Sequence, residues 1–220
     1  MGRLLNIVTP LHTRTARDYI GRMTDDKVHC MEVARRFDAD YWDGDRRYGY
    51  GGYRYDGRWA AVAERLIATY QLPADAKILD VGCGKAFLLY EFTRLLPGCT
   101  VVGLDISEHA LATAKEEVRG NLMQHSAADT LPFGDKQFDL AISLNVVHNL
   151  PVEYATCALA EMARVAKNQF LVVESYRSPR ELFNLQCWAL TCESFLRPAS
   201  WEWLMQEADY EGDFEFIYFE

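Results

Sequence analysis

The sequence predicts a doubly wound α/β fold, a mostly parallel sheet with helices on both faces, preceded by an N-terminal helical and aromatic lid. From Lys77 onward, apolar runs alternate with amphipathic stretches, which is typical of parallel βαβ units. Half of the 220 residues are hydrophobic and a quarter are charged, as in ordinary globular proteins. We therefore expect an N-terminal extension, residues 1–70, and one α/β domain, residues 71–220.

Short apolar runs predict strands at residues 77–81, 100–104, 122–125, 138–144 and 170–174. Helices are expected between them at 87–96, 108–118 and 152–166, and Pro97-Gly98 and Gly120 end the first two. Ser200 is expected to cap a short helix that runs through Ala208. A last strand follows at 214–219, whereas residues 182–196 fit either a helix or a strand.

The N-terminal extension also contains helical patterns. Residues 56–70 place Trp59, Val62, Ala63, Leu66, Ile67 and Tyr70 on one face of a helix. Thr24 is a candidate cap for an earlier helix that presents Val28, Met31 and Phe37.

Residues 41–59 differ from the rest of the chain. They consist of five Tyr, five Gly, four Arg, three Asp and two Trp, with neither helical nor strand periodicity. The glycines supply backbone freedom, and the aromatic rings offer contact area at a low rotamer cost. Two interpretations stay open: a lid or substrate wall, or an aromatic plug that packs one edge of the sheet.

Charge and composition exclude several classes of protein. With 23 basic and 32 acidic residues the formal charge is −9, which disfavours nucleic acid or an anionic membrane as the main partner. An anionic small molecule remains compatible, because a local basic patch can lie within an acidic chain. The longest uncharged stretch, residues 140–152, has 13 residues, too few for a membrane span of about 20.

The sequence also indicates a cytoplasmic protein that binds no metal ion. No secretory signal follows the start of the chain. The six cysteines lack CxxC spacing and are expected to be reduced thiols. No His/Asp/Glu cluster has metal-ligand spacing, so no metal is expected.

The first strand leads into a glycine-rich loop, Asp80-Val-Gly-Cys-Gly-Lys-Ala-Phe87. A phosphate-binding P-loop would need Ser or Thr at Ala86 and Gly at Leu79. A dinucleotide fingerprint would need a small residue at Phe87. The loop instead reads G-x-G-x-A after an acidic residue.

This loop resembles that of class I S-adenosylmethionine-dependent methyltransferases, with Ala86 in the place of the last glycine. Asp105, 21 residues after Gly84, and the segment Ala127-Ala-Asp-Thr-Leu-Pro-Phe133 match further motifs of the family, and the resemblance covers about residues 75–175. It implies a Rossmann-like fold and S-adenosylmethionine as the cofactor.

The resemblance also implies roles for individual residues in cofactor binding. Asp80 would accept from the ammonium group of the cofactor, and Gly82, Cys83 and Gly84 would let the backbone approach it. Asp105 and Ile106 would bind the ribose, Ala128 and Asp129 the adenine, and Asn145 would line the pocket. The alternative for Asp105 and Asp129 is a turn or a helix cap.

In such a fold the reaction centre lies beyond the carboxyl ends of the strands. His148 is a candidate general base, with a structural role as the alternative, and Glu174 and Tyr176 are candidates to orient the acceptor. By analogy with N-terminal appendages in the family, Tyr48, Tyr50, Tyr53 and Tyr55 would line the acceptor pocket. Arg54, with Arg46, Arg47 and Arg58, would hold an acidic group of the acceptor or pair with nearby aspartates.

We therefore expect methyl transfer to a small molecule, such as a metabolite, a natural-product intermediate or a nucleotide-linked sugar. An NAD(P)-dependent oxidoreductase is disfavoured by Phe87 and by the Asp129 segment, and a non-catalytic S-adenosylmethionine-binding protein is a third possibility. The family sheet has two strands after its last helix. Either residues 188–195 supply one of them, or the sheet is one strand short. The methylated atom and the oligomeric state are not predicted.

Overall fold

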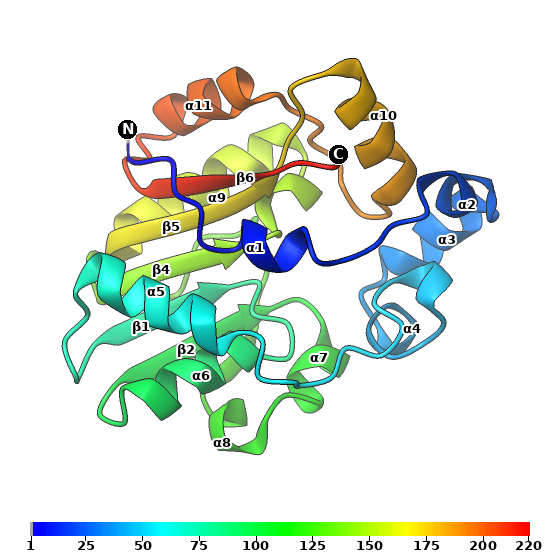
Figure 1. Cartoon of the computed structure of the whole chain (residues 1–220). Helices are drawn as coiled ribbons and strands as arrows, with labels where there is room; N and C mark the ends of the chain where they lie inside the picture. The colour runs from blue at the N-terminus through cyan, green and yellow to red at the C-terminus, as the bar shows by residue number, and fades with distance from the viewer. Residues whose placement is uncertain (1) are drawn as a thin grey trace.

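A computed structural model describes residues 2–220, and its centre is a six-stranded parallel sheet (Figure 1). The spatial order is β3-β2-β1-β4-β5-β6, and every neighbouring pair is parallel. The strands are β1 Lys77–Val81, β2 Thr100–Asp105, β3 Leu122–Gln124, β4 Phe138–Leu144, β5 Ala166–Glu174 and β6 Asp213–Ile217. The order reverses between β1 and β4, the switch point where open α/β sheets bind ligands.

Both faces of the sheet are buried, because successive residues of each strand point to opposite sides. Ile78 of β1 packs with α5 (Ala60–Tyr70), α6 (Phe87–Leu95) and α10 (Pro179–Trp188). Leu79 packs on the other face with α9 (Val152–Val165) and α11 (Pro198–Glu207). Figure 1 shows α5 and α6 in front of the sheet and α9 behind it. The predicted doubly wound fold is confirmed.

The segment that precedes α5 reaches the carboxyl ends of the strands, on the right of Figure 1. It contains α1 (Thr9–His12), α2 (Tyr19–Thr24), α3 (Lys27–Ala34), α4 (Ala39–Trp42) and a 3-10 turn, η1 (Arg46–Tyr48). The prediction that Thr24 caps the helix that follows is wrong, because Thr24 ends α2 and its hydroxyl donates to the Ile20 carbonyl. Phe37 lies beyond the end of α3, and Val28 is exposed.

The outer edge of β6 is covered by the N-terminal strand-like segment. Leu5 donates its N–H to the Phe214 carbonyl at 2.8 Å, and Phe214 donates to the Arg3 carbonyl at 3.0 Å. The buried Glu215 carboxylate continues this pairing by accepting from the backbone N–H groups of residues 7–9 at 2.5–3.1 Å. No strand forms in residues 188–195, so in the described chain the sheet has one strand after α11.

Three predicted helices have different boundaries. The helix expected from residue 56 begins at Ala60, because Gly57 has a positive φ of 78°. The helix expected at 108–118 is broken into α7 (Glu108–Ala112) and α8 (Glu116–Arg119). Lys115 interrupts it with an extended backbone, and its ammonium lies 4.4 Å from the ring centroid of Tyr90. Ser200 lies within α11, which begins at Pro198.

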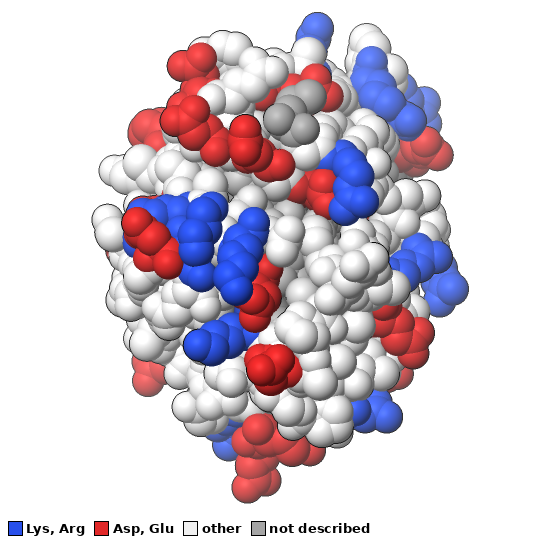
Figure 2. Space-filling model, turned by 90° about the vertical axis from the view of Figure 1, so that its left-hand side faces the viewer, with Lys and Arg blue, Asp and Glu red and all other residues white. Residues whose placement is uncertain are grey.

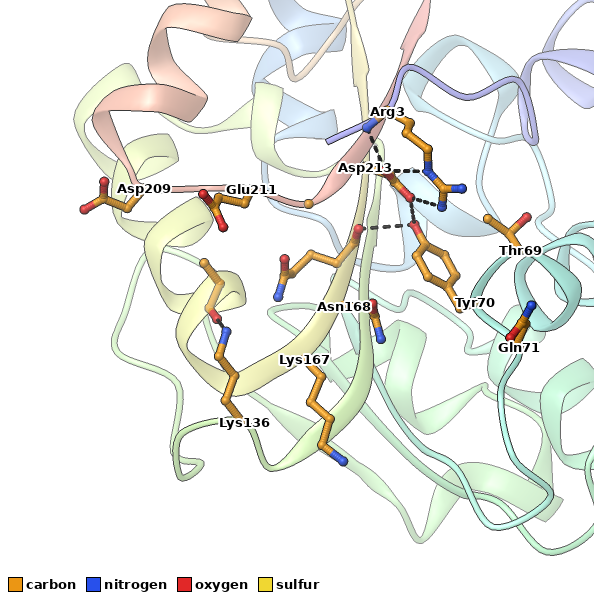
Figure 3. Close-up of a pocket in the computed structure, with 13 residues that line it drawn as sticks. Arg3, Thr69, Tyr70, Gln71, Lys136, Lys167, Asn168, Asp209, Glu211 and Asp213 are labelled. Atoms are coloured by element: carbon orange, nitrogen blue, oxygen red, sulfur yellow. Dashed lines mark hydrogen bonds and ion pairs between the residues drawn. The ribbon is translucent and has the colours of Figure 1, made fainter. Parts of the chain in front are cut away.

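An open hollow of about 460 Å³ lies at the opposite end of the sheet, where the strands begin (Figure 3). Several of its charged groups are engaged in the fold: Asp213 accepts from Arg3 and from the Tyr70 hydroxyl, and Lys136 donates to the carbonyls of Ala163 and Ala166. Figure 2 shows this side of the molecule, where basic and acidic side chains lie close to one another.

Within residues 2–220, none of the helices has both the length and the apolar character that crossing a membrane requires. All six cysteines are free thiols.

Candidate active site

Three adjoining cavities open at the carboxyl ends of β1, β2, β4 and β5. The β2 cavity, about 130 Å³, is lined by Asp105, Ile106 and Ala127 among others. The loop cavity, about 210 Å³, is lined by Asp80 and the glycine-rich loop. The arginine cavity, about 470 Å³, contains Arg17, Arg22, Arg46, Arg54, Arg58, His148, Glu174 and Trp188 in its wall. Asn145 and Tyr50 line all three cavities, so the cavities meet at these two residues.

The glycine-rich loop turns sharply between β1 and α6. Gly82 and Gly84 have φ values of 83° and 54°, which side-chain-bearing residues rarely adopt. A Cβ on Gly82 would lie 2.2 Å from Val146, and one on Gly84 would lie 2.7 Å from the ring of Trp42. Ala86, in the place of the third family glycine, adopts the same left-handed conformation at φ 54°. The substitution therefore leaves the loop conformation intact, at a cost of about 1–2 kcal/mol.

Asp80 is the most unusual acid in the site. It ends β1 almost fully buried, at 4% exposure, and its carboxylate makes no hydrogen bond to the described residues. Burial, and then the charge of Asp105, raises the pKa of Asp80 to about 8. A cationic ligand group in the loop cavity would stabilise the ionised carboxylate.

Asp105 organises the loop from the end of β2. Its carboxylate accepts from the backbone N–H groups of Gly84 at 2.7 Å and Ser107 at 2.8 Å. Burial nevertheless raises its pKa, against the opposing effect of these bonds. Asp105 and Ile106 line the β2 cavity together, as predicted for one binding site.

The predicted adenine contacts are not brought together. Asp129 is exposed, and neither Asp129 nor Ala128 lines the β2 cavity; Ser126 and Ala127 do. The Ala128 N–H is directed to the Ser126 hydroxyl at 3.1 Å, because the chain turns tightly after β3. In the loop after β3, the residues that line the cavity are therefore Ser126 and Ala127 instead of the predicted Ala128 and Asp129.

Asn145, at the end of β4, has an unpaired polar atom. Its backbone is left-handed at φ 60°, held by a hydrogen bond from its N–H to the Val172 carbonyl. The side-chain Oδ1 is buried and has no hydrogen-bond partner among the described residues. Such a buried acceptor favours a ligand that donates a hydrogen bond at the junction of the cavities.

Part of the aromatic segment, residues 41–59, covers the glycine-rich loop. Trp42 lies against Gly84 and donates its indole N–H to Ser107 at 2.9 Å. Tyr53 stacks on Phe87, with ring centroids 5.1 Å apart. Asp43 adds an ionic link, since its carboxylate contacts Lys85 of the loop and His109 of α7, each at 2.7 Å.

Only some of the predicted substrate residues line a cavity. Tyr50, Tyr53 and Arg54 do so. Tyr48 packs edge-on against His29, and the Tyr55 hydroxyl donates to Glu91 of α6 at 2.6 Å, so both are directed away from the cavities. Tyr176 also lines none of them and packs beneath Arg197.

His148 and Glu174 form a buried pair between β4 and β5. The Glu174 backbone N–H donates to His148 Nδ1 at 3.2 Å, and His148 Nε2 lies 3.4 Å from the Glu174 carboxylate. In a neutral imidazole one nitrogen accepts and the other carries the proton, so Nε2–H faces the carboxylate. Burial lowers the pKa of His148 to about 3. The prediction of His148 as a general base is therefore wrong. In this arrangement Nδ1 accepts a hydrogen bond and Nε2 carries the proton, so the ring has no free lone pair.

The pKa of Glu174 is raised by burial, whereas that of His148 is lowered. It faces the arginine cavity, and burial raises its pKa to about 7, although the charge of Arg17 opposes this rise. A carboxylate with a pKa near neutrality can accept a proton at physiological pH.

No pattern in the sequence indicated Arg17, Arg22 or Trp188 as residues of the arginine cavity. Arg17 and Arg22 come from the segment around α2, and Trp188 ends α10. No local motif marks them, because only the fold brings these segments to one place. Within residues 2–220, no group of three His, Cys, Asp or Glu side chains is arranged to hold a metal ion.

Comparison with known proteins agrees with the geometry. Residues 78–169, which span β1 to β5, match a family model described as "Methyltransferase domain". This part of the chain is therefore similar to a methyltransferase domain, and it forms most of the Rossmann-like sheet described above.

Particular relatives share this domain. The chain is 35% identical over 109 residues to a demethylmenaquinone methyltransferase of Staphylococcus carnosus, covering 47% of this chain and 44% of the relative. It is 30% identical over 126 residues to a tRNA (carboxymethyluridine(34)-5-O)-methyltransferase of Arabidopsis thaliana, covering 56% and 29%. The chain thus spans less than half the length of these relatives.

Among solved structures, the fold is similar to that of a SAM-dependent methyltransferase from Archaeoglobus fulgidus. The TM-score is 0.55 at 20% identity, over 72% of this chain and 70% of that one.

Proposed function

We propose that this protein transfers a methyl group from S-adenosylmethionine to a small-molecule acceptor held in the arginine cavity. The observation that carries the proposal is Asp80, a buried carboxylate without a hydrogen-bond partner, beside a loop whose glycines admit no Cβ. The methyltransferase domain match over residues 78–169 supports it.

The cofactor site fits the chemistry of S-adenosylmethionine. Asp80 would bind the ammonium group in the loop cavity, while Gly82 and Gly84 let the backbone approach the ligand. Asp105 would accept from the ribose hydroxyls in the β2 cavity. The free Oδ1 of Asn145 would accept a hydrogen bond where the cavities meet.

When bound, the cofactor supplies a methyl group on a sulfonium; the transfer breaks the carbon–sulfur bond, leaves its electron pair on sulfur, and joins the methyl to the acceptor's nucleophilic atom. The protein's main task is to hold these atoms in line. For an acceptor that arrives protonated, Glu174 receives the proton. His148 acts as a positioning residue, because the Glu174 backbone N–H donates to its Nδ1 and its Nε2 lies 3.4 Å from the Glu174 carboxylate.

The acceptor cavity favours a small anionic molecule. Its volume of about 470 Å³ is in the range of small-ligand sites, and five arginines line it. The net charge of −9 disfavours a nucleic acid, which selects a broad basic surface.

Calorimetric titration with S-adenosylhomocysteine and with NADH tests the cofactor assignment. We expect micromolar binding of S-adenosylhomocysteine and none of NADH. Asp80→Asn should weaken this binding at least tenfold, whereas Asp129→Asn, at an exposed position outside the cavities, should not. Binding of NADH alone, or of neither compound, would refute the proposal.

Catalysis is tested by incubating the protein with methyl-labelled S-adenosylmethionine and fractionated metabolites. Once an acceptor is found, Glu174→Gln should lower kcat and abolish its rise with pH near 7. His148→Asn, which can still donate to Glu174, should retain more activity than His148→Phe. An unchanged pH profile in Glu174→Gln would eliminate Glu174 as the base.

A further inference from the structure

We infer that three guanidinium groups gathered around Trp188 form a binding site for a carboxylate or phosphate group of the acceptor; this inference rests on the proposed function. The groups belong to Arg17, Arg22 and Arg46. All three line the arginine cavity.

The three arginines converge on one indole ring. The Cζ atoms of Arg17, Arg22 and Arg46 lie 5.4, 4.9 and 5.2 Å from the ring centroid of Trp188. They come from the segment before α2, from α2 and from η1, respectively. Cation–π attraction to one ring contributes about 0.5–2 kcal/mol per cation, which does not remove the repulsion among three like charges.

None of these three arginines forms an ion pair with a carboxylate among the described residues. Neighbouring arginines do: Arg47 pairs with Asp25 at 2.7 Å, and Arg58 pairs with Asp56. Arg22 instead donates to the carbonyls of Arg46 and Arg47, which leaves its charge uncompensated.

Arg17 has a further unsatisfied group. Its Nη1 donates to the carbonyls of His12 and Thr15, and its Nη2 donates to His12 Nδ1, but its Nε is buried without a hydrogen-bond partner. Burial lowers the pKa of Arg17 and of Arg22, and the charge of Arg46 lowers that of Arg22 further.

Glu174 and His12 also line the cavity beside this cluster, while Tyr19 acts on Arg17 and Asp25, Cys30 and Tyr41 act on Arg22 through their charges. Glu174 acts on Arg17 through its charge but lies outside ion-pair distance, and its pKa of about 7 leaves it only partly ionised at neutral pH. Burial, and then Arg17, lowers the pKa of His12 to about 4, so His12 adds no charge at pH 7. The wall of the cavity around Trp188 is therefore positive, and an anion would stabilise it.

Carboxylates and phosphates fit the donors present, because a planar guanidinium binds either group through two parallel hydrogen bonds. Such an anion would contact the N-terminal segment and the aromatic segment, residues 41–59, at once. The acidic group of the acceptor would thereby bring these two segments together over the cavity.

The test measures thermal stability with inorganic phosphate or with benzoate, each against sodium chloride at equal ionic strength. We expect one or both anions to raise the Tm of the wild-type protein, and the stronger of the two identifies the anion class. Arg17→Gln and Arg46→Gln should each weaken binding of the anion at least tenfold. Arg47→Gln is the matched control, because Arg47 is paired with Asp25 and lines none of the cavities.

Binding of S-adenosylhomocysteine is measured in parallel for every variant. Retained binding in Arg17→Gln and Arg46→Gln shows that these proteins are folded and that the cofactor assignment stands. If the anion does not raise the Tm of the wild type, or raises it equally in all four proteins, the proposed anion site is overturned and the proposed function is not. Failure of the wild type to bind S-adenosylhomocysteine would instead remove the proposed function.

Discussion

Asp80→Asn should stabilise the ligand-free protein, and increasingly so as the pH rises from 5 to 8. Asp80 is 4% exposed and has no hydrogen-bond partner in the described chain, so folding removes most of the water around its carboxylate without supplying a protein donor. Asparagine has nearly the same shape and cannot ionise. The substitution therefore removes the electrostatic cost while keeping the packing around β1.

The magnitude follows from the pKa of Asp80, which burial raises from 3.8 to about 8. Between these values the folded protein retains a proton that the unfolded chain has lost. The free energy of unfolding therefore falls as the pH rises, by about 1.4 kcal/mol per unit, and levels off above pH 8. At pH 7, about three units above the unfolded value, the loss amounts to about 4 kcal/mol.

Urea unfolding followed by circular dichroism at pH 5, 6, 7 and 8 measures this effect. The difference between Asp80→Asn and the wild type cancels the contributions of other titrating groups. It should grow by about 1.4 kcal/mol per pH unit from pH 5 to 7 and by less between pH 7 and 8. Asp129→Asn, at an exposed position, serves as the control. A difference that stays constant from pH 5 to 8 would refute the reasoning, since Asp80 would then be ionised throughout.

Three further predictions concern the cofactor site and the edge of the sheet. Binding of S-adenosylhomocysteine at pH 7 should release about 0.9 protons as Asp80 ionises, measured by calorimetry in buffers of different ionisation enthalpy. Gly82→Ala should lower the free energy of unfolding by about 1–3 kcal/mol and abolish binding of S-adenosylhomocysteine, because the new Cβ would clash with Val146. Gly120→Ala is the control and should have neither effect, because a Cβ at that position meets open space. Glu215→Gln should lower the free energy of unfolding by about 1–3 kcal/mol, because an amide cannot accept from all three backbone N–H groups. Amide hydrogen exchange of residues 3–9 should become faster, and unchanged exchange would contradict this role of Glu215.

The sequence was sufficient for the sheet and for the loop that begins the cofactor site. Strands such as β1 and β4 matched residue by residue, because their apolar runs are buried on both faces and leave little choice of register. Asp80 and the glycines could be predicted as site residues because their spacing is local. The match of residues 78–169 to a methyltransferase domain model agrees with the resemblance that the loop carries.

The acceptor side could not be predicted in the same way. The roles of His148 and Glu174 depend on a hydrogen bond between the end of β5 and a ring buried after β4, which no spacing reveals. Arg17 and Trp188 meet only because the chain folds back over the sheet. At the break between α7 and α8, Lys115 lies over the rings of Tyr55 and Tyr90, a contact that no local spacing reveals.

The carboxylate of Glu215 has a consequence for folding. The Ile7 N–H that it binds lies 208 residues away in the chain, so this contact closes a very long loop. Contacts of such long sequence separation must offset the entropy of loop closure before they stabilise the fold. His12 and Arg17 follow directly after this anchor and line the arginine cavity. The part of the cavity wall that these two residues form therefore depends on an edge strand that is distant from it in sequence.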